Sequence, residues 1–151
     1  MAADASTIHA SAVLVGRKAA LIRGPSGSGK SYLAWRLLQA AAQGALPFAR
    51  LVADDRAFVE AHAGRLLVRP APTLAGLIEI RGLGIRRVAY EPIATVGLVV
   101  DLAAPDSERH PPETALKADI AGVPLPRLAV AAGIDPLPAV LAQLTTLTTG
   151  N

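Results

Sequence analysis

The fold is constrained most strongly by one segment, Gly24-Pro25-Ser26-Gly27-Ser28-Gly29-Lys30-Ser31. It fits the phosphate-binding loop pattern of Gly, four residues and Gly-Lys-Ser/Thr. An apolar run over residues 19–22 precedes it, and residues 32–43 place their apolar side chains on one helical face. Strand, loop and helix in this order aim the helix N-terminus at bound phosphate. The sequence therefore predicts an α/β fold in which helices flank a central sheet.

The positions of this loop have separable expected tasks. Glycines let the backbone curl so that its N–H groups face phosphate oxygens. Lys30 is expected to reach the outer phosphates, and Ser31 to offer its hydroxyl to Mg²⁺. A Gly-rich turn without a ligand is the alternative interpretation. The predicted nucleotide-binding residues are Gly24, Pro25, Ser26, Gly27, Ser28, Gly29, Lys30 and Ser31.

Composition narrows the class of protein. A chain of 151 residues that is 52% hydrophobic and 3% aromatic predicts one domain, residues 1–151, with an aliphatic core. The net charge of +3 comes mainly from scattered arginines without aromatic neighbours, so a nucleic-acid surface has no support. The chain has no Cys, no apolar segment of membrane-spanning length and no signal-peptide pattern. We expect a cytoplasmic protein that binds neither nucleic acid nor membrane.

Two adjacent carboxylates follow the next apolar run. Residues 48–53 are expected to form a strand, and Asp54 and Asp55 come directly after it. In a parallel sheet the carboxyl ends of neighbouring strands meet at one edge, so these side chains are expected near the phosphates. Neighbours in an extended backbone point to opposite sides, so at most one can face the reacting phosphate. A solvated Asp-Asp turn is the alternative.

Other charged residues have open roles on local evidence. Residues 76–85 alternate Glu79 and Arg81 with isoleucines, which is typical of a half-exposed strand before a glycine bend. Residues 95–102 are typical of a buried strand, and their Asp101 rivals Asp54 and Asp55 as the carboxylate that serves the metal. His9 opens an expected strand over residues 8–15, and a lone histidine is more often structural than catalytic.

Taken together, these motifs resemble the catalytic domain of HPr kinase/phosphorylase, the bacterial enzyme that phosphorylates and dephosphorylates a serine of the phosphocarrier HPr. In chain order they are Ile8-His9-Ala10, residues 24–31, residues 50–55 and Glu79-Ile80-Arg81-Gly82-Leu83-Gly84-Ile85. The resemblance covers His9 to about Asp101 and is closest in the last motif. It implies a P-loop kinase of the HPr kinase/PEP carboxykinase-like type, in the short proteobacterial form without the N-terminal domain.

The resemblance also implies particular residue roles. Asp55 is the acid/base for the serine hydroxyl, His9 the active-site histidine and Arg109, by a looser match, the later active-site arginine. Together with Lys30 these form the expected catalytic set. The expected metal residues are Ser31, Glu79 and Asp54. The implied activity is ATP- and Mg²⁺-dependent phosphorylation of an HPr-like carrier, with inorganic phosphate as co-substrate for the reverse phosphorolysis, in a homo-hexamer.

Two departures from the family pattern favour kinase over phosphorylase activity. Tyr32 stands where the family has an acidic residue after the loop serine, which removes a negative charge beside the metal site. The family's loop for dephosphorylation is reduced to Pro124-Leu125-Pro126-Arg127. Two alternatives stay open, a small-metabolite kinase and a non-catalytic module that senses a nucleotide or phosphate.

Overall fold

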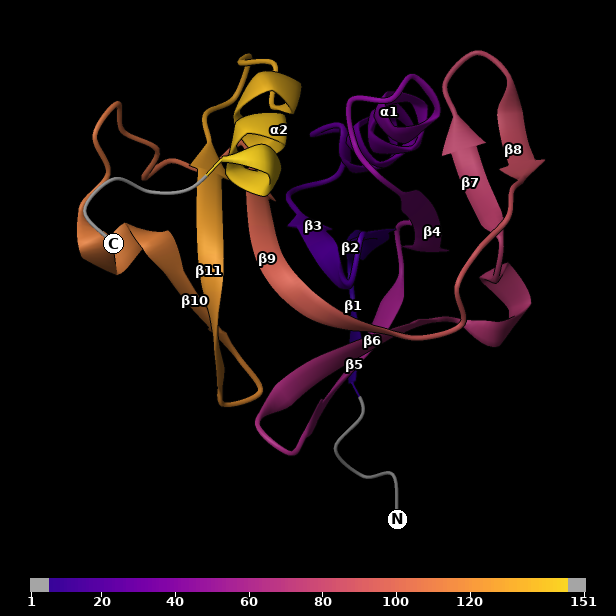
Figure 1. The fold of residues 1–151 in the computed structure, drawn as a ribbon, viewed down its shortest axis with the longest axis horizontal. Coiled ribbons are helices and arrows are strands. Elements are labelled where there is room, and N and C mark those ends of the chain that lie inside the picture. Colours follow the sequence, from indigo (N-terminus) through magenta and orange to yellow (C-terminus); the bar gives the residue numbers. More distant parts are fainter. Residues whose placement is uncertain (1–5, 147–151) are drawn as a thin grey trace.

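The computed structural model describes residues 6–146 and places the phosphate-loop segment between a central strand and a helix (Figure 1). Strand β3 (Lys18–Arg23) leads into the loop, and helix α1 (Lys30–Ala42) leads out of it. The helix begins at Lys30, two residues before the expected start, because Gly29 at φ 100° ends the loop in a left-handed conformation. The strand–loop–helix order predicted from the motif is therefore present.

The main sheet is a curled, mixed sheet of nine strands. Its path runs β1-β5-β6-β9-β3-β2-β4, and β11 pairs with both β9 and β10. Besides β3, its strands are β1 (Ser6–Ile8), β2 (Ala10–Val15), β4 (Ala49–Ala53), β5 (Ala57–His62), β6 (Arg65–Pro70), β9 (Ala94–Leu102), β10 (Lys117–Ile120) and β11 (Val123–Val130). The strand expected over residues 8–15 is interrupted at His9, because β1 pairs with β5 whereas β2 pairs with β3 and β4.

Strand direction brings four strand ends to one edge of the sheet. Strand β9 is parallel to both β3 and β11. Strand β2 lies antiparallel between β3 and β4, so β3 and β4 run in the same direction although they are not neighbours. The sheet is thus mixed rather than parallel on this side. The residues that follow β3 and β4 still lie at the same edge.

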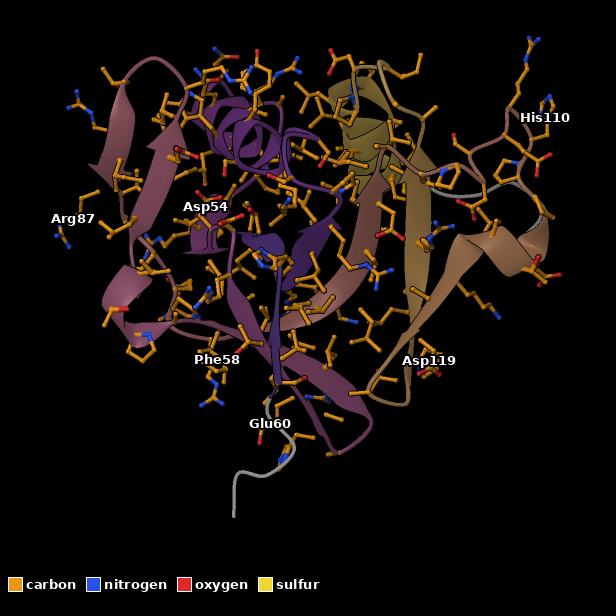
Figure 2. All side chains as sticks on the ribbon, turned by 180° about the vertical axis from the view of Figure 1, so that it is seen from behind. Asp54, Phe58, Glu60, Arg87, His110 and Asp119 are labelled. Carbon is orange, nitrogen blue, oxygen red and sulfur yellow. The ribbon has the colours of Figure 1, made fainter. Side chains whose placement is uncertain are left out.

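The core lies on both faces of the sheet. Helix α1 and helix α2 (Leu137–Thr145) cover one face, where Leu33, Leu37 and Val140 pack against strand residues. On the other face the curling sheet packs against itself through the β5–β6 and β10–β11 hairpins. Side chains alternate accordingly on β5, where Ala57 and Val59 are buried while Phe58 and Glu60 point outward (Figure 2).

A separate two-stranded hairpin stands beside α1 (Figure 1). It consists of β7 (Leu77–Ile80) and β8 (Gly84–Arg87), with Ile78 fully buried against the helix side of the core. Arg81 lies in the turn that follows β7, so the alternating strand expected over residues 76–85 ends before it. Short 3₁₀ turns occur at Pro72–Leu74 and Glu113–Leu116.

Helix α2 ends at Thr145, and Thr146 follows it in an extended conformation. Neither helix of residues 6–146 combines the length and the apolar character that crossing a membrane requires.

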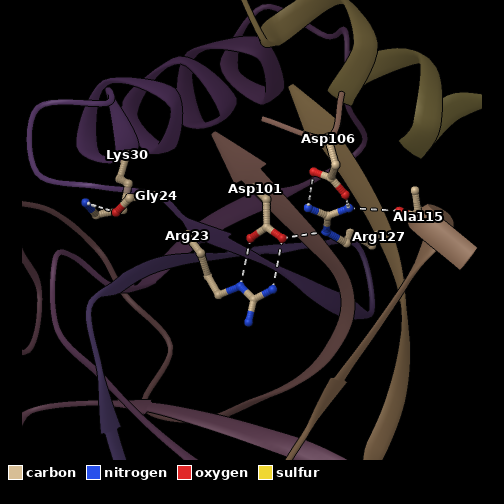
Figure 3. Close-up of polar contacts among 7 residues, drawn as sticks. All are labelled: Arg23, Gly24, Lys30, Asp101, Asp106, Ala115 and Arg127. Carbon is tan, nitrogen blue, oxygen red and sulfur yellow. Dashed lines mark hydrogen bonds and ion pairs between the residues drawn. The ribbon is translucent and has the colours of Figure 1, made fainter. Parts of the chain in front are cut away.

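A charge network connects the strand ends that precede and flank the loop (Figure 3). Arg23 and Asp101 are opposite partners on β3 and β9, and Arg23 donates two hydrogen bonds of 2.7 and 2.9 Å to the Asp101 carboxylate. Arg127 on β11 donates a third of 2.6 Å. Arg127 also binds Asp106 at 2.8 and 3.0 Å and the carbonyl of Ala115 at 3.0 Å. The network therefore joins three strands to the segment that follows β9.

These contacts change the ionisation of Asp101. Burial opposes the charged form, but the hydrogen bonds from Arg23 and Arg127 outweigh it and hold the pKa of Asp101 below its ordinary value of 3.8. A folded-state pKa below the unfolded value contributes stability that is fully present above the unfolded pKa. That contribution is lost as the pH falls through the folded pKa.

Substitution of Asp101 by Asn leaves both arginines without their shared countercharge. We expect the free energy of unfolding at pH 7 to fall by about 2 kcal/mol in urea denaturation. Because protonation removes the same charge in the wild type, the difference between the two proteins should shrink below about pH 4. Asp119→Asn, at an exposed residue of strand β10, is the control and should change stability by less than about 0.5 kcal/mol. An equal Asp101→Asn effect at pH 7 and pH 3 contradicts the ionic explanation.

Candidate active site

The phosphate loop has an open, curled backbone that depends on glycine. Gly27 and Gly29 have φ angles of 82° and 100°, where a side chain is unfavourable. Ser28 N–H donates to the carbonyl of Pro25 at 3.0 Å, which closes the curl. At Gly24 an added Cβ would lie 2.5 Å from Ser28 Oγ and 3.1 Å from Leu102 Cβ. A larger residue at the first position would therefore require Ser28 and the end of β9 to shift.

Lys30 lies inside the loop rather than in solvent. Only 7% of its surface is exposed, and its Nζ donates to the carbonyls of Gly24 at 2.9 Å and Pro25 at 3.3 Å. An ammonium group is a compact charge with three donors and binds phosphate oxygens as readily as carbonyls. Lys30 is therefore positioned to exchange these carbonyls for the phosphates of a ligand in the loop.

Asp54 is a buried carboxylate that fixes three elements. It is 8% exposed, and its Oδ1 accepts hydrogen bonds from Ser11 Oγ at 2.8 Å and Ser31 Oγ at 2.7 Å. Its Oδ2 accepts one from the N–H of Glu79 at 2.9 Å. Strand β2, the first turn of α1 and strand β7 are thereby held against the end of β4.

Asp55, the next residue, has a different environment. It is exposed, and its φ of 65° places a non-glycine residue in the left-handed region, at a cost on the order of 1 kcal/mol. Its N–H donates to Ser11 Oγ at 3.1 Å, which helps to hold this conformation. The kink turns the two neighbouring carboxylates to different surroundings, one buried under the loop and the other at the wall of a cavity.

The cavity lies between the loop, α1 and the tip of the β7–β8 hairpin. Its volume is about 1250 Å³. Lys30, Ser31, Asp55 and Glu79 line one part of it, and Tyr32, Trp35 and Gln39 continue along α1. Residues 80–84 form the opposite wall. The residues expected to bind phosphate and to act as acid/base therefore share one space with room for a ligand larger than phosphate.

The oxygen groups around Ser31 suit a magnesium ion. The Ser31 hydroxyl, the Asp54 carboxylate and the exposed Glu79 are hard oxygen donors of the type that Mg²⁺ prefers. Within residues 6–146, no group of three His, Cys, Asp or Glu side chains is close enough to hold a metal by itself. A magnesium ion here would therefore depend on the serine hydroxyl and on ligand phosphates, as is usual for this ion.

Two residues of the expected catalytic set, His9 and Arg109, are not among the residues that line the cavity. His9 is exposed at the break between β1 and β2. Arg109 is exposed in the loop after β9, beside His110, which lies at the outer edge of the molecule away from Asp54 (Figure 2). Their roles stay predictions. His9 follows Ile8, the pairing partner of Ala57, so the backbone places it beside the segment that carries Asp55, whereas Arg109 lies in the loop after β9.

Sequence reasoning missed the arginine partners of Asp101. The residue does end a strand parallel to β3, as expected of a metal-serving aspartate. Both of its oxygens, however, are bound by Arg23 and Arg127. The signal available in the sequence was the alternation of side chains that begins at Val123 and places Arg127 on a strand. Pro124 and Pro126 obscured this signal. The arginine pairing accounts for Asp101 without a ligand.

Comparison with known proteins agrees with this arrangement. The family model of the HPr Serine kinase C-terminal domain matches residues 1–130. The chain is similar in structure to the Hpr(Ser) kinase/phosphatase from Coxiella burnetii, with 27% sequence identity and a TM-score of 0.70, over 92% of this chain and 93% of that chain. No sequence among the curated proteins matches significantly. The expected α/β fold of the HPr kinase type is thus confirmed, and the chain belongs to the HPr serine kinase C-terminal domain family.

Proposed function

We propose that this chain is an ATP- and Mg²⁺-dependent kinase that phosphorylates a serine of an HPr-like phosphocarrier. The observation that carries the proposal is the presence of Lys30, Ser31 and Asp55 in the wall of one cavity. The loop supplies a phosphate site, and the exposed aspartate supplies a base. The family and the similar Coxiella burnetii protein, described as an Hpr(Ser) kinase/phosphatase, support HPr as the substrate class.

In the proposed reaction, the carboxylate of Asp55 accepts the proton of the substrate serine as its oxygen attacks the terminal phosphorus of ATP. The bond between that phosphorus and the bridging oxygen breaks, and ADP leaves. Lys30 exchanges its loop carbonyls for phosphate oxygens and neutralises the charge that develops there. Phosphoserine forms on the carrier, and the proton remains on Asp55.

Ser31, Asp54 and Glu79 would hold the magnesium ion in this proposal. Bound there, it would neutralise phosphate charge and orient the nucleotide. Asp54 is buried and already hydrogen bonded to Ser31, so this part of the site is assembled by the fold. Glu79 is exposed, and the hydrogen bond from its backbone N–H to Asp54 holds the β7–β8 hairpin beside this part of the site.

We propose the kinase direction as the main activity. Phosphorolysis of phosphoserine by inorganic phosphate would use the same loop and would have the protonated Asp55 return its proton to the serine oxygen. Arg127, in the segment that corresponds to the family's dephosphorylation loop, is bound by Asp101 and Asp106. An arginine engaged by two carboxylates has little freedom to serve a phosphate. A hexamer in the cytoplasm remains our expectation from the family.

Asp55→Asn tests the base. Asparagine tolerates the left-handed backbone but cannot accept the proton, so we expect transfer to serine to fall about 1000-fold while ATP binding stays within about twofold. The protein is incubated with Mg²⁺-ATP and HPr-like carriers of the same cell, phosphoserine is quantified by mass spectrometry, and ATP binding is measured by calorimetry. Asp119→Asn is the matched control and should retain wild-type transfer.

Two results contradict the proposed function. Near-normal transfer by Asp55→Asn would remove this residue from the base role. Nucleotide binding by the wild type without transfer to any carrier would favour the non-catalytic sensing module.

We also expect Asp101→Asn to retain transfer under conditions where the variant is folded. In the wild type the Asp101 carboxylate is engaged by Arg23 and Arg127 and so is not needed for the reaction.

Glu79→Gln tests the metal residues separately. The side chain is exposed, and its backbone N–H, which binds Asp54, is unaffected by the substitution. We expect the Mg²⁺ concentration for half-maximal transfer to rise about tenfold without loss of stability. Glu60→Gln on β5 is the matched control, and unchanged Mg²⁺ dependence in Glu79→Gln would exclude Glu79 from the metal site.

A further inference from the structure

Aromatic side chains gather at one place in the candidate active site. The chain has one Trp, two Tyr and two Phe, and of these Tyr32 and Trp35 line the cavity that also holds Lys30 and Ser31. Residues 32, 35 and 39 share the face of α1 that looks into the cavity. Tyr32 follows Ser31 directly and is 62% exposed. An exposed ring therefore stands next to the phosphate loop.

The ring of Tyr32 is held by neighbours rather than left to move freely. The guanidinium carbon of Arg36 lies 5.3 Å from the ring centroid, over one face. Arg36 donates hydrogen bonds of 2.5 and 3.2 Å to the two oxygens of Asp135. Asp135 in turn accepts a hydrogen bond of 3.1 Å from the N–H of Leu137 at the start of α2. These contacts favour one position of the ring, which lowers the entropy cost for a ligand that stacks on it.

We propose that Tyr32 is a stacking platform for the aromatic base of the nucleoside triphosphate whose phosphates bind the loop. The inference rests on the proposed function, since it extends the same ligand from the loop along α1. The cavity of about 1250 Å³ is larger than a triphosphate needs, and along the helix after Ser31 it is lined by the aromatic residues Tyr32 and Trp35. A base joined to the bound phosphates through its ribose is the group whose chemistry matches such a surface.

Stacking also determines how well the site can distinguish one nucleotide base from another. Every base has a π face, and stacking alone distinguishes poorly among them. Trp35 and Gln39 on α1 and Leu83 on the hairpin also line this cavity, and of these three only Gln39 carries an amide that could read a base edge. Adenine and guanine nucleotides should therefore bind with similar affinity.

The test compares ligands with and without a base. Binding of Mg²⁺-ATP, Mg²⁺-GTP and Mg²⁺-tripolyphosphate is measured by calorimetry for the wild type, Tyr32→Ala and Tyr32→Phe. We expect Tyr32→Ala to weaken ATP and GTP about tenfold and to leave tripolyphosphate within about twofold, whereas Tyr32→Phe keeps the wild-type affinities. Quenching of Trp35, the only tryptophan of the chain, gives a second readout inside the same cavity.

Phe48 provides a matched control. It is also a partly exposed aromatic residue, at 38%, and Arg50 lies over its ring at the same 5.3 Å, but it does not line the cavity. Phe48→Ala should therefore leave all three affinities unchanged. Thermal denaturation of each variant checks that the comparison is made on folded protein.

Each of the other outcomes contradicts the stacking role of Tyr32 and indicates a different explanation. Equal weakening of ATP and tripolyphosphate by Tyr32→Ala would mean that the ring supports the loop. Unchanged ATP affinity with a raised KM for the carrier would assign the ring to the protein substrate. Wild-type protein that binds ATP no better than tripolyphosphate would remove the platform but keep the phosphate site. Binding of neither ligand would overturn the proposed function itself.

Discussion

The buried carboxylate of Asp54 is the contact on which the arrangement of the site depends. It accepts hydrogen bonds from Ser11, Ser31 and the backbone of Glu79, which belong to β2, α1 and β7. A buried carboxylate is costly unless such bonds satisfy it, so the three elements are favoured in this one arrangement. Without it, the helix and the small hairpin would meet mainly through apolar contacts, which have no direction. The cavity between them is therefore shaped by a polar interaction at its base.

The loop is held at both of its ends and open in between. Arg23, the residue before Gly24, is bound by Asp101 on the neighbouring strand, and Ser31, the last residue of the motif, is bound by Asp54. Fixed ends let the intervening backbone keep its curl without filling it with side chains, which would lower the reorganisation needed for the proposed binding of phosphate. The walls differ in character, since α1 contributes aromatic residues and the hairpin tip contributes glycines and Leu83.

The sequence allowed the loop, its strand and helix, the family and the glycine bend after Glu79 to be predicted, because each depends on residues close together in the chain. It did not reveal the antiparallel β2 between β3 and β4, the break at His9 or the arginine pair around Asp101. Arg23 and Asp101 are 78 positions apart, and their contact depends on strand register, which local patterns do not determine. The sequence correctly predicts that Asp101 lies near the end of a strand. Its hydrogen bonds from Arg23 and Arg127, which the sequence does not reveal, are what change the role assigned to it.

The left-handed backbone of Asp55 affects which substitutions can accumulate at this position during evolution. Glycine adopts this conformation without strain, so a chain under selection for stability alone would gain from replacing Asp55 and would keep its fold. Loss of phosphoryl transfer would then leave the loop, the sheet and the family resemblance intact. If Asp55 has the proposed role of base, we expect the residue at this one kink to indicate retained chemistry better than the phosphate loop does.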